Sequence, residues 1–260
     1  MIVVSDLSEK FRLQTARVCK CSPFGAYIES YMNSYGDRRY SFVEFWLHFE
    51  NDRPDSAFCR YYDTLIFCGE SSIEAEDFMR MLSPQTLLCS ASCGFSFDGM
   101  EKHSGELMQL TNKSTVSDTL PDDFKAAELT GDMYSLKEVY SLLCSSFSRN
   151  NESDFETFFI DNSHKIRHSA AQMYAVYDES GSIASTLSVS ALSSSAAVIG
   201  SIATRDDLRR NGIAGAMLTH ISQRIESNGK EVFLMRRENI ELYEKCGFSV
   251  VGAWEEWEKR

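Results

Sequence analysis

The segment LRRNGIAGAML, residues 208–218, lies between two apolar stretches and is typical of a loop that ends where a helix begins. The first backbone N–H groups of a helix have no partners within the helix, and they carry partial positive charge. Gly212 and Gly215 leave these groups uncovered by side chains. Arg209 and Arg210 add full positive charges beside them. These residue types at this spacing predict a binding site for an anion such as a phosphate group.

The charge around this segment differs from the charge of the whole chain. The chain has a net charge of −12, whereas residues 204–237 contain seven basic and four acidic residues. An anionic ligand would therefore find a favourable patch here. The overall acidity argues against nucleic acid as a partner, because neutralising its phosphates requires a basic face. It is compatible with an amine-bearing substrate, and equally with a surface that simply favours solubility.

Two well-known phosphate-binding loops do not fit the segment. It lacks the Gly-Lys-Ser/Thr ending of a P-loop, and it is not a G-x-G-x-x-G loop with an acidic residue closing a βαβ unit. Taken alone, the segment fits either an anion-binding loop or an ordinary turn with incidental glycines.

The elements that must position this loop alternate regularly after residue 124. We expect strands at residues 124–130, 171–178, 182–192, 196–204, 231–235 and 248–257, and helices at 133–147, 152–166, 208–229 and 239–247. This order predicts an α+β domain at residues 125–260, with one hairpin-rich sheet covered by helices.

The first part of the chain predicts a second, smaller α+β domain at residues 1–110. The sequence from Ser8 to Tyr35 predicts helix, with a break at SPFG. The segments that follow predict strands at 40–50, 56–69 and 86–91. They also predict a helix at 71–82 that is capped by Ser71 or Ser72. Residues 111–124 are rich in Ser, Thr and Asp and show no periodicity, so they predict an interdomain linker.

The composition sets limits on the class of protein. No stretch approaches the about 18 apolar residues that span a bilayer, and the N-terminus does not read as a signal peptide, so we expect a cytoplasmic protein without membrane contact. The eight cysteines follow no disulfide or zinc-binding spacing, and the five histidines are scattered. We therefore expect reduced thiols and no metal site.

A second motif, ENIELYEKCGF at residues 238–248, follows the long helix and one strand. With it, residues 126–257 resemble the GNAT superfamily of acyl-CoA N-acyltransferases. The family motif Arg/Gln-x-x-Gly-x-Gly/Ala is filled by Arg209, Gly212 and Ala214. The downstream pattern L-Y-x-K-x-G-F is matched by Leu242, Tyr243, Lys245, Gly247 and Phe248.

The resemblance implies a GNAT-like mixed, mostly antiparallel sheet and a site for acetyl-CoA as co-substrate, with no metal. It places the cofactor on Ile202, Ala203, Thr204, Arg209, Arg210, Asn211, Gly212, Ile213, Ala214 and Gly215. The pantetheine arm would pair with the strand end at 202–204, and the pyrophosphate would lie on the backbone of 210–215. Tyr243 matches the family's tyrosine that protonates the departing thiolate, a role that suits a phenol because it stays protonated near neutral pH. The alternative for Tyr243 is a core aromatic on a short helix.

The sequence departs from the family pattern in two ways. Arg236 stands where many relatives have an asparagine, seven residues before Tyr243, and Asn239 stands only four before it. The strand at 196–204 carries no carboxylate that could act as a general base. The remaining candidates are the acids Glu238, Glu255, Glu256 and Glu258, each of which is equally a solvated surface acid.

The resemblance thus implies an N-acetyltransferase that transfers the acetyl group of acetyl-CoA to a primary amine of a small molecule or peptide. The missing base leaves a non-catalytic CoA-binding sensor or scaffold as the alternative. The N-terminal domain is either a degenerate half of the same fold or an unrelated α+β domain that lines the substrate cleft or mediates a homodimer.

Overall fold

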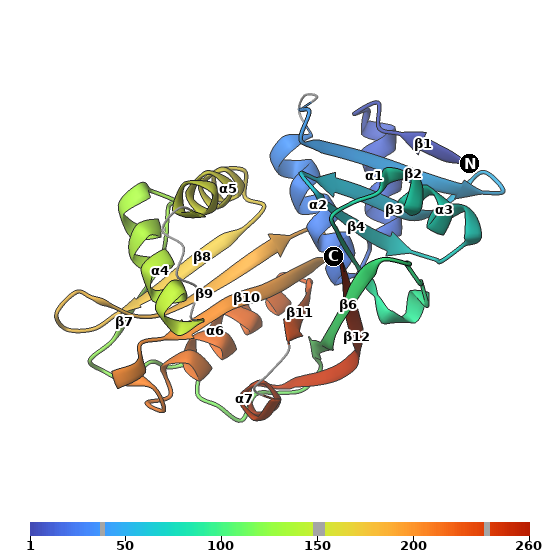
Figure 1. Cartoon of the computed structure of the whole chain (residues 1–260). Coiled ribbons are helices and arrows are strands. Elements are labelled where there is room, and N and C mark those ends of the chain that lie inside the picture. The colour runs from blue at the N-terminus through green and yellow to red at the C-terminus, as the bar shows by residue number, and fades with distance from the viewer. Residues whose placement is uncertain (37–39, 148–153, 237–239) are drawn as a thin grey trace.

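A computed structural model of the protein describes residues 1–36, 40–147, 154–236 and 240–260. Within these residues the strands form one 12-stranded sheet, in the order β1-β2-β3-β4-β5-β12-β6-β11-β10-β9-β8-β7 (Figure 1). Most neighbouring strands are antiparallel, and helices cover the sheet on both faces. The predicted α+β class, with a mixed and mostly antiparallel sheet flanked by helices, is confirmed.

The two halves of the chain contain nearly the same succession of elements. The N-terminal half consists of β1 (Ile2–Val4), α1 (Glu9–Val18), α2 (Pro23–Tyr35), β2 (Val43–Glu50), β3 (Arg53–Tyr61), β4 (Thr64–Gly69), α3 (Ile73–Leu82), β5 (Thr86–Ser90) and β6 (Met100–Leu110). The C-terminal half consists of β7 (Lys125–Glu128), α4 (Met133–Ser146), α5 (Phe155–Arg167), β8 (Gln172–Tyr177), β9 (Ile183–Leu192), β10 (Ala196–Thr204), α6 (Ile213–Ser227), β11 (Glu231–Arg236), α7 (Ile240–Lys245) and β12 (Phe248–Lys259). A 3-10 turn at Ala91–Cys93 stands where the second half has α7.

The strand order reflects this internal repeat. Read from either edge, the sheet begins with four antiparallel strands, and the fourth strand then pairs in parallel with the fifth: β4 with β5, and β10 with β11. The N-terminal half therefore has the same sheet topology as the half that carries the predicted anion-binding loop.

The last strand of each half lies inside the other half. β12 pairs with β5, with Trp257 opposite Leu87, and β6 pairs with β11, with Leu234 opposite Met108. β6 and β12 also pair with each other along almost their full lengths. Each half thus completes the sheet of its partner half, and the segments predicted as domains at 1–110 and 125–260 are interlocked.

The structure corrects the predicted strand at residues 56–69. This segment forms two strands, β3 and β4, joined by a tight turn in which Tyr62 has a φ of +50°. β3 begins at Arg53, inside the predicted turn NDRPD, because Asn51 and Asp52 both have positive φ and make a two-residue hairpin turn. Asparagine and aspartate tolerate this conformation better than other non-glycine residues.

Two strands were not predicted at all, and one helix starts later than predicted. β1 is only three residues long, and β6 has the sequence MEKHSGELMQL, in which charges and a glycine obscure any alternation. α6 begins at Ile213 rather than Leu208, because Gly212 is its N-cap with a φ of +79°. The other predicted helices and strands of residues 125–260 are present.

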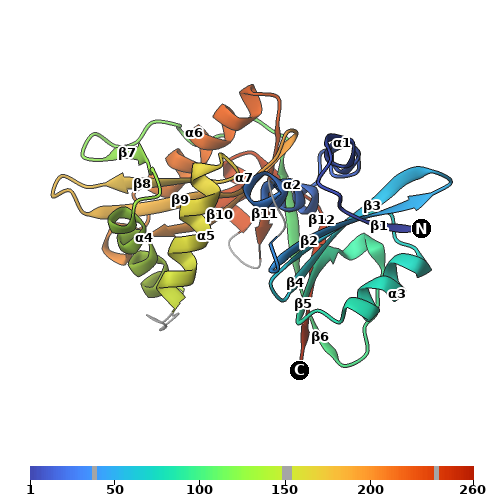
Figure 2. The ribbon, with the colours of Figure 1, turned by 90° about the horizontal axis from the view of Figure 1, so that it is seen from above.

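Helix α6 lies on one face of the C-terminal half, and α4 and α5 lie on the other (Figure 2). Helix α7 packs against the same core as α6. α6 packs through Ile213, Met217 and Leu218 onto alternate residues of β10 and β11, such as Ile199 and Leu234. Burying these side chains contributes on the order of 2 kcal/mol each to folding. Among the helices whose residues are described, none combines the length and apolar content needed to cross a bilayer.

Helix α2 belongs to the N-terminal half but also packs against β9 and β10 of the other half. Ala26 packs in one cluster with Ala196 and Val198 of β10, on the face of the sheet opposite α6. The Ser30 hydroxyl donates a hydrogen bond of 2.8 Å to the Ala170 carbonyl, which precedes β8. α2 is therefore shared by the two halves.

Residues 111–124, the predicted linker, contain no helix or strand and lie against the C-terminal half. The backbone N–H groups of Thr111 and Asn112 donate to the Gly247 carbonyl, and that of Thr115 donates to the Lys245 carbonyl. Val116 packs against the core beneath α6. The segment thus supports the loop and helices that surround the cavity described next.

Candidate functional site

The predicted loop and the predicted tyrosine surround one cavity of about 820 Å³. Its walls come from the end of β10, the following loop, the first turn of α6, α7 and the end of α4. The lining residues are Ser146, Phe147, Ile202, Ala203, Thr204, Leu208, Arg209, Arg210, Gly212, Ile213, Ala214, Gly215, Glu241, Leu242, Tyr243 and Lys245. Of the residues predicted to bind the cofactor, only Asn211 does not line it. Its side chain donates to the Leu208 carbonyl instead.

The sheet opens beside this cavity. The parallel pairing of β10 with β11 runs only from Ala196 to Ile199. Beyond it β10 bulges between Gly200 and Ala203, and Ser201 has a φ of +49°. Within the part of the chain that the structure describes, the edge of β10 that faces β11 has no strand partner over these residues. A chain-like ligand that carries amide groups could pair with this edge as an added strand does.

The first turn of α6 is built to approach a ligand closely. Gly212 has a φ of +79°, which favours glycine, and a Cβ at this position would meet nothing within 4 Å. The first helical bond runs from the Ala216 N–H to the Gly212 carbonyl, and no side chain caps the helix start. The N–H groups of Ile213, Ala214 and Gly215 precede that bond, so they point out of the helix start.

Gly215 is a glycine for a different reason. A Cβ on Gly215 would lie 3.0 Å from Cγ1 of Val116 and 3.5 Å from Cδ1 of Leu242. Contacts at 3.0 Å are tighter than ordinary packing allows. This glycine lets the 111–124 segment and α7 pack directly against the first turn of α6.

The two arginines of the loop differ in their contacts. Arg209 forms an ion pair of 2.5 Å with Asp206 and donates from Nε to the Thr204 carbonyl at 3.2 Å. These contacts close the loop that follows β10. Arg210 lies at a φ of +67° and is exposed at the cavity. Arg209 therefore shapes the loop, while Arg210 adds charge at its mouth.

Tyr243 is held on α7, across the cavity from the loop. It is half-buried and packs against the core formed under α6. α7 is fixed by a hydrogen bond from the Cys246 N–H to the Leu242 carbonyl and by an ion pair of 2.8 Å between Lys245 and Glu241. A phenol, exposed helix N–H groups and an open strand edge are thus brought to one cavity.

Comparison with known protein families agrees with this geometry. Residues 136–248 match the acetyltransferase (GNAT) family. The C-terminal half of this chain is a GNAT domain. The match spans the helices, strands and loop that form the cavity.

Solved structures extend the likeness to the whole chain. The chain is similar to a tandem GNAT protein from the clavulanic acid biosynthesis pathway, with a TM-score of 0.59 and 13% identity over 99% of this chain and 97% of that one. It is also similar to a Drosophila protein, with a TM-score of 0.63 and 12% identity over 100% and 98%. A GCN5-related N-acetyltransferase from Sphaerobacter thermophilus gives a TM-score of 0.58 and 15% identity over 99% and 95%. No curated protein sequence matches the chain significantly.

The N-terminal half is therefore a GNAT-like fold, as one of the two sequence alternatives predicted. Its counterpart of α6 is α3, and the start of α3 is unsuited to an anion. The Ser72 hydroxyl accepts from the Ala75 N–H, and Glu74 and Glu76 place negative charge in the first turn. Glu74 also binds the amino group of Met1. Of these two matching helices, only α6 begins without a side-chain cap.

None of the three described acids predicted as base candidates lines the cavity of the GNAT domain. Glu255, Glu256 and Glu258 lie on β12 where it pairs with β5 and β6, and Glu255 binds Lys102 at 2.5 Å. Glu238 and Asn239 lie outside the described residues, and Arg236 ends β11. The described residues also hold no cluster of three or more His, Cys, Asp or Glu that could bind a metal ion.

Glu241, the one carboxylate among the described residues that line the cavity, was not predicted. A hydrogen bond from Lys245 lowers the pKa of Glu241, which makes this carboxylate a weak proton acceptor. Ser146 and Phe147 were also missed, because they reach the site from the end of α4, more than fifty residues before the loop. The Ser146 hydroxyl is buried without a hydrogen-bond partner in the described part of the chain. No sequence signal marks these two residues.

Proposed function

We propose that this protein is an acetyltransferase that moves the acetyl group of acetyl-CoA to a primary amine. One observation carries the proposal: the open edge of β10, the uncapped start of α6 and Tyr243 all meet at a single cavity. The acceptor is an amine on a small molecule or peptide.

The residues present fit acetyl-CoA in three respects. The exposed N–H groups at 213–215 and the charge of Arg210 suit the pyrophosphate. The edge of β10 at 202–204 suits the amides of the pantetheine arm, because an amide-bearing chain can form strand-like hydrogen bonds with an open strand edge. The empty space above Gly212 removes the steric obstacle to a bulky anion.

The proposed chemistry is direct attack of the amine on the thioester carbonyl. Backbone N–H groups near Ile202 stabilise the negative charge that develops on the carbonyl oxygen. The nitrogen gains the acyl bond and loses a proton to water, because Glu241, the one carboxylate among the described residues that line the cavity, is paired with Lys245. The carbon–sulfur bond breaks, and Tyr243 gives its proton to the leaving sulfur.

The test is a panel of primary amines incubated with the protein and acetyl-CoA, with acetylated products detected by mass spectrometry. We expect at least one amine to gain an acetyl group in an enzyme-dependent manner. If the protein binds CoA but acetylates none of the panel, the alternative of a non-catalytic CoA-binding sensor or scaffold replaces this proposal. If it does not bind CoA, both are wrong.

A further inference from the structure

The gap between β10 and β11 opens at Gly200, the first residue after their paired segment. A Cβ on Gly200 would lie 3.7 Å from the Ser190 hydroxyl and 3.9 Å from the Ser188 hydroxyl, both on β9. Gly200 and Ser190 are each partly exposed. A ligand arm that follows β10 from the cavity therefore meets two serine hydroxyls where the gap begins.

The N-terminal half supplies a third hydroxyl at this point. The Tyr27 hydroxyl, on α2, lies 3.2 Å from the Ser190 hydroxyl. Ser190 uses its own hydrogen to donate to the Val198 carbonyl, so Tyr27 is the donor in the pair. Burial raises the pKa of Tyr27, which keeps this donor protonated. Tyr27 and Met235 of β11 both pack against the cluster that contains Ala196 and Val198 of β10.

One hydroxyl in this group has no partner. Ser188 is 4% exposed, and its hydroxyl makes no hydrogen bond within the part of the chain that the structure describes. Buried polar groups are nearly always hydrogen-bonded in folded proteins. The unpartnered hydroxyl beside Gly200 thus points to a polar group that joins it when the site is filled.

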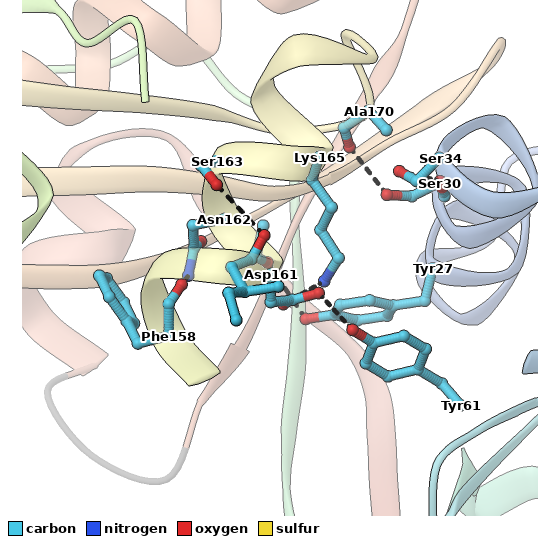
Figure 3. Close-up of polar contacts among 12 residues, drawn as sticks. Tyr27, Ser30, Ser34, Tyr61, Phe158, Asp161, Asn162, Ser163, Lys165 and Ala170 are labelled. Carbon is cyan, nitrogen blue, oxygen red and sulfur yellow. Dashed lines mark hydrogen bonds and ion pairs between the residues drawn. The ribbon is translucent and has the colours of Figure 1, made fainter. Parts of the chain in front are cut away.

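The nearby charges from α5 are already paired. Lys165 is 6% exposed, and its Nζ lies 2.9 Å from Asp161 Oδ2 and 4.4 Å from the centre of the Tyr31 ring. The Tyr61 hydroxyl donates to Asp161 Oδ1 at 2.7 Å, and Tyr27 extends toward this group from α2 (Figure 3). Lys165 and Asp161 therefore pair with each other, and the described groups nearest to Gly200 are the hydroxyls of Ser190 and Ser188.

We propose that the acceptor amine binds on this face of the sheet, over Gly200, and that Tyr27 of the N-terminal half is one of its binding residues. The inference rests on the proposed function. The acceptor is a primary amine that carries a hydroxyl or amide group close to its nitrogen, because that group matches the hydroxyls of Tyr27, Ser188 and Ser190. The N-terminal half thus takes part in choosing the acceptor.

The test uses bromoacetyl-CoA, whose carbon beside the thioester carbonyl alkylates a nearby thiol with loss of bromide. In Ser190→Cys, we expect the new thiol to be alkylated at least tenfold faster than Cys21, an exposed native thiol that reports the reaction with free reagent. Excess CoA should remove this advantage. Ser188→Cys is a second placement if the first variant does not fold. The sites are identified by peptide mass spectrometry.

The outcomes separate this proposal from the proposed function. If the variants bind CoA and the introduced thiols react no faster than Cys21, the acceptor does not bind over Gly200, although acetyl transfer still stands. If the native chain does not bind CoA, both proposals are wrong. A second test measures steady-state kinetics with an amine that the native protein acetylates. Tyr27→Phe should raise the KM for this amine about tenfold and leave the KM for acetyl-CoA unchanged. Tyr31→Phe, one helical turn away, should change neither.

Discussion

Tyr61 and Asp161 join the two halves of this protein through a hydrogen bond of 2.7 Å between the tyrosine hydroxyl and Oδ1 of the carboxylate. Tyr61 ends β3 in the N-terminal half, and Asp161 lies on α5 of the GNAT domain. The same carboxylate neutralises the buried Lys165. Asp161 therefore holds α5 against the N-terminal half and also forms an ion pair with the buried Lys165.

Asp161→Ala should destabilise the protein by about 3 kcal/mol, because it leaves the ammonium group of Lys165 buried and unpaired. Urea denaturation measures this change. The double variant Asp161→Ala/Lys165→Met should recover most of the loss, since it removes the unpaired charge and fills the same volume. A double variant no more stable than the single variant would show that the charge is not the cause.

Because β6 and β12 each lie in the sheet of the other half, we expect neither half to fold as a separate chain. Residues 125–260 alone lack β5 and β6, so β11 would lose one partner strand and β12 would lose both of its partners. We expect this fragment to be unfolded by circular dichroism and NMR, and co-expression with residues 1–124 to restore a folded complex. A folded, monomeric 125–260 fragment would contradict the interlocked arrangement.

The predicted domain boundaries show where sequence reasoning stops. The elements of residues 125–260 were predicted because their helices and strands have clear periodicity, as in the apolar face of α6. β6 has no such pattern, and its partners lie more than a hundred residues away in β11 and β12. Strand exchange depends on these distant pairings, so a local pattern could not reveal it.

The same distinction applies to the candidate site. The loop that lines the cavity could be picked out from the sequence because its residues are continuous and are marked by glycines such as Gly212. Its role in binding a cofactor stays a prediction. Ser146 and Tyr27 come from α4 and α2, and only tertiary packing brings them near the sheet. Their residue types are common, so nothing in the sequence distinguishes them.

Asp178, in the turn between β8 and β9, should make the free energy of unfolding depend on pH. The Ser180 hydroxyl donates to Asp178 at 2.6 Å, and with the Ser182 N–H and Arg205 it lowers the pKa of Asp178 to about 2. Because the folded pKa lies below the unfolded value of about 4, this stabilisation is present at neutral pH and is lost as the pH falls from about 4 through 2.

Asp178→Asn should therefore be less stable than the native protein at pH 7, and the difference should shrink as the pH is lowered toward 3. Chemical denaturation at a series of pH values measures this. Glu179→Gln, in the same turn, is the matched control and should show no such trend. A difference that stays constant with pH would mean that ionisation of Asp178 does not matter.

Tyr243→Phe tests the proposed proton donor. The change keeps the ring that packs against the core and removes the hydroxyl, so we expect kcat to fall by one to three decades while the Kd of CoA stays nearly constant. Steady-state kinetics and calorimetry measure the two quantities. Tyr134→Phe, at an exposed position on α4, controls for loss of a phenol elsewhere. Undiminished turnover in Tyr243→Phe would refute the assignment.

The central claim is that the open start of α6 binds the pyrophosphate of CoA, and a pair of matched variants tests it most directly. Gly212 and Gly229 both have positive φ, and both have open space where a Cβ would lie. They stand at opposite ends of α6, so Gly212→Asp and Gly229→Asp introduce similar strain and the same charge. Calorimetric titration with CoA should show binding to the native protein and to Gly229→Asp, and none to Gly212→Asp. Equal CoA affinity in the two variants would contradict the account.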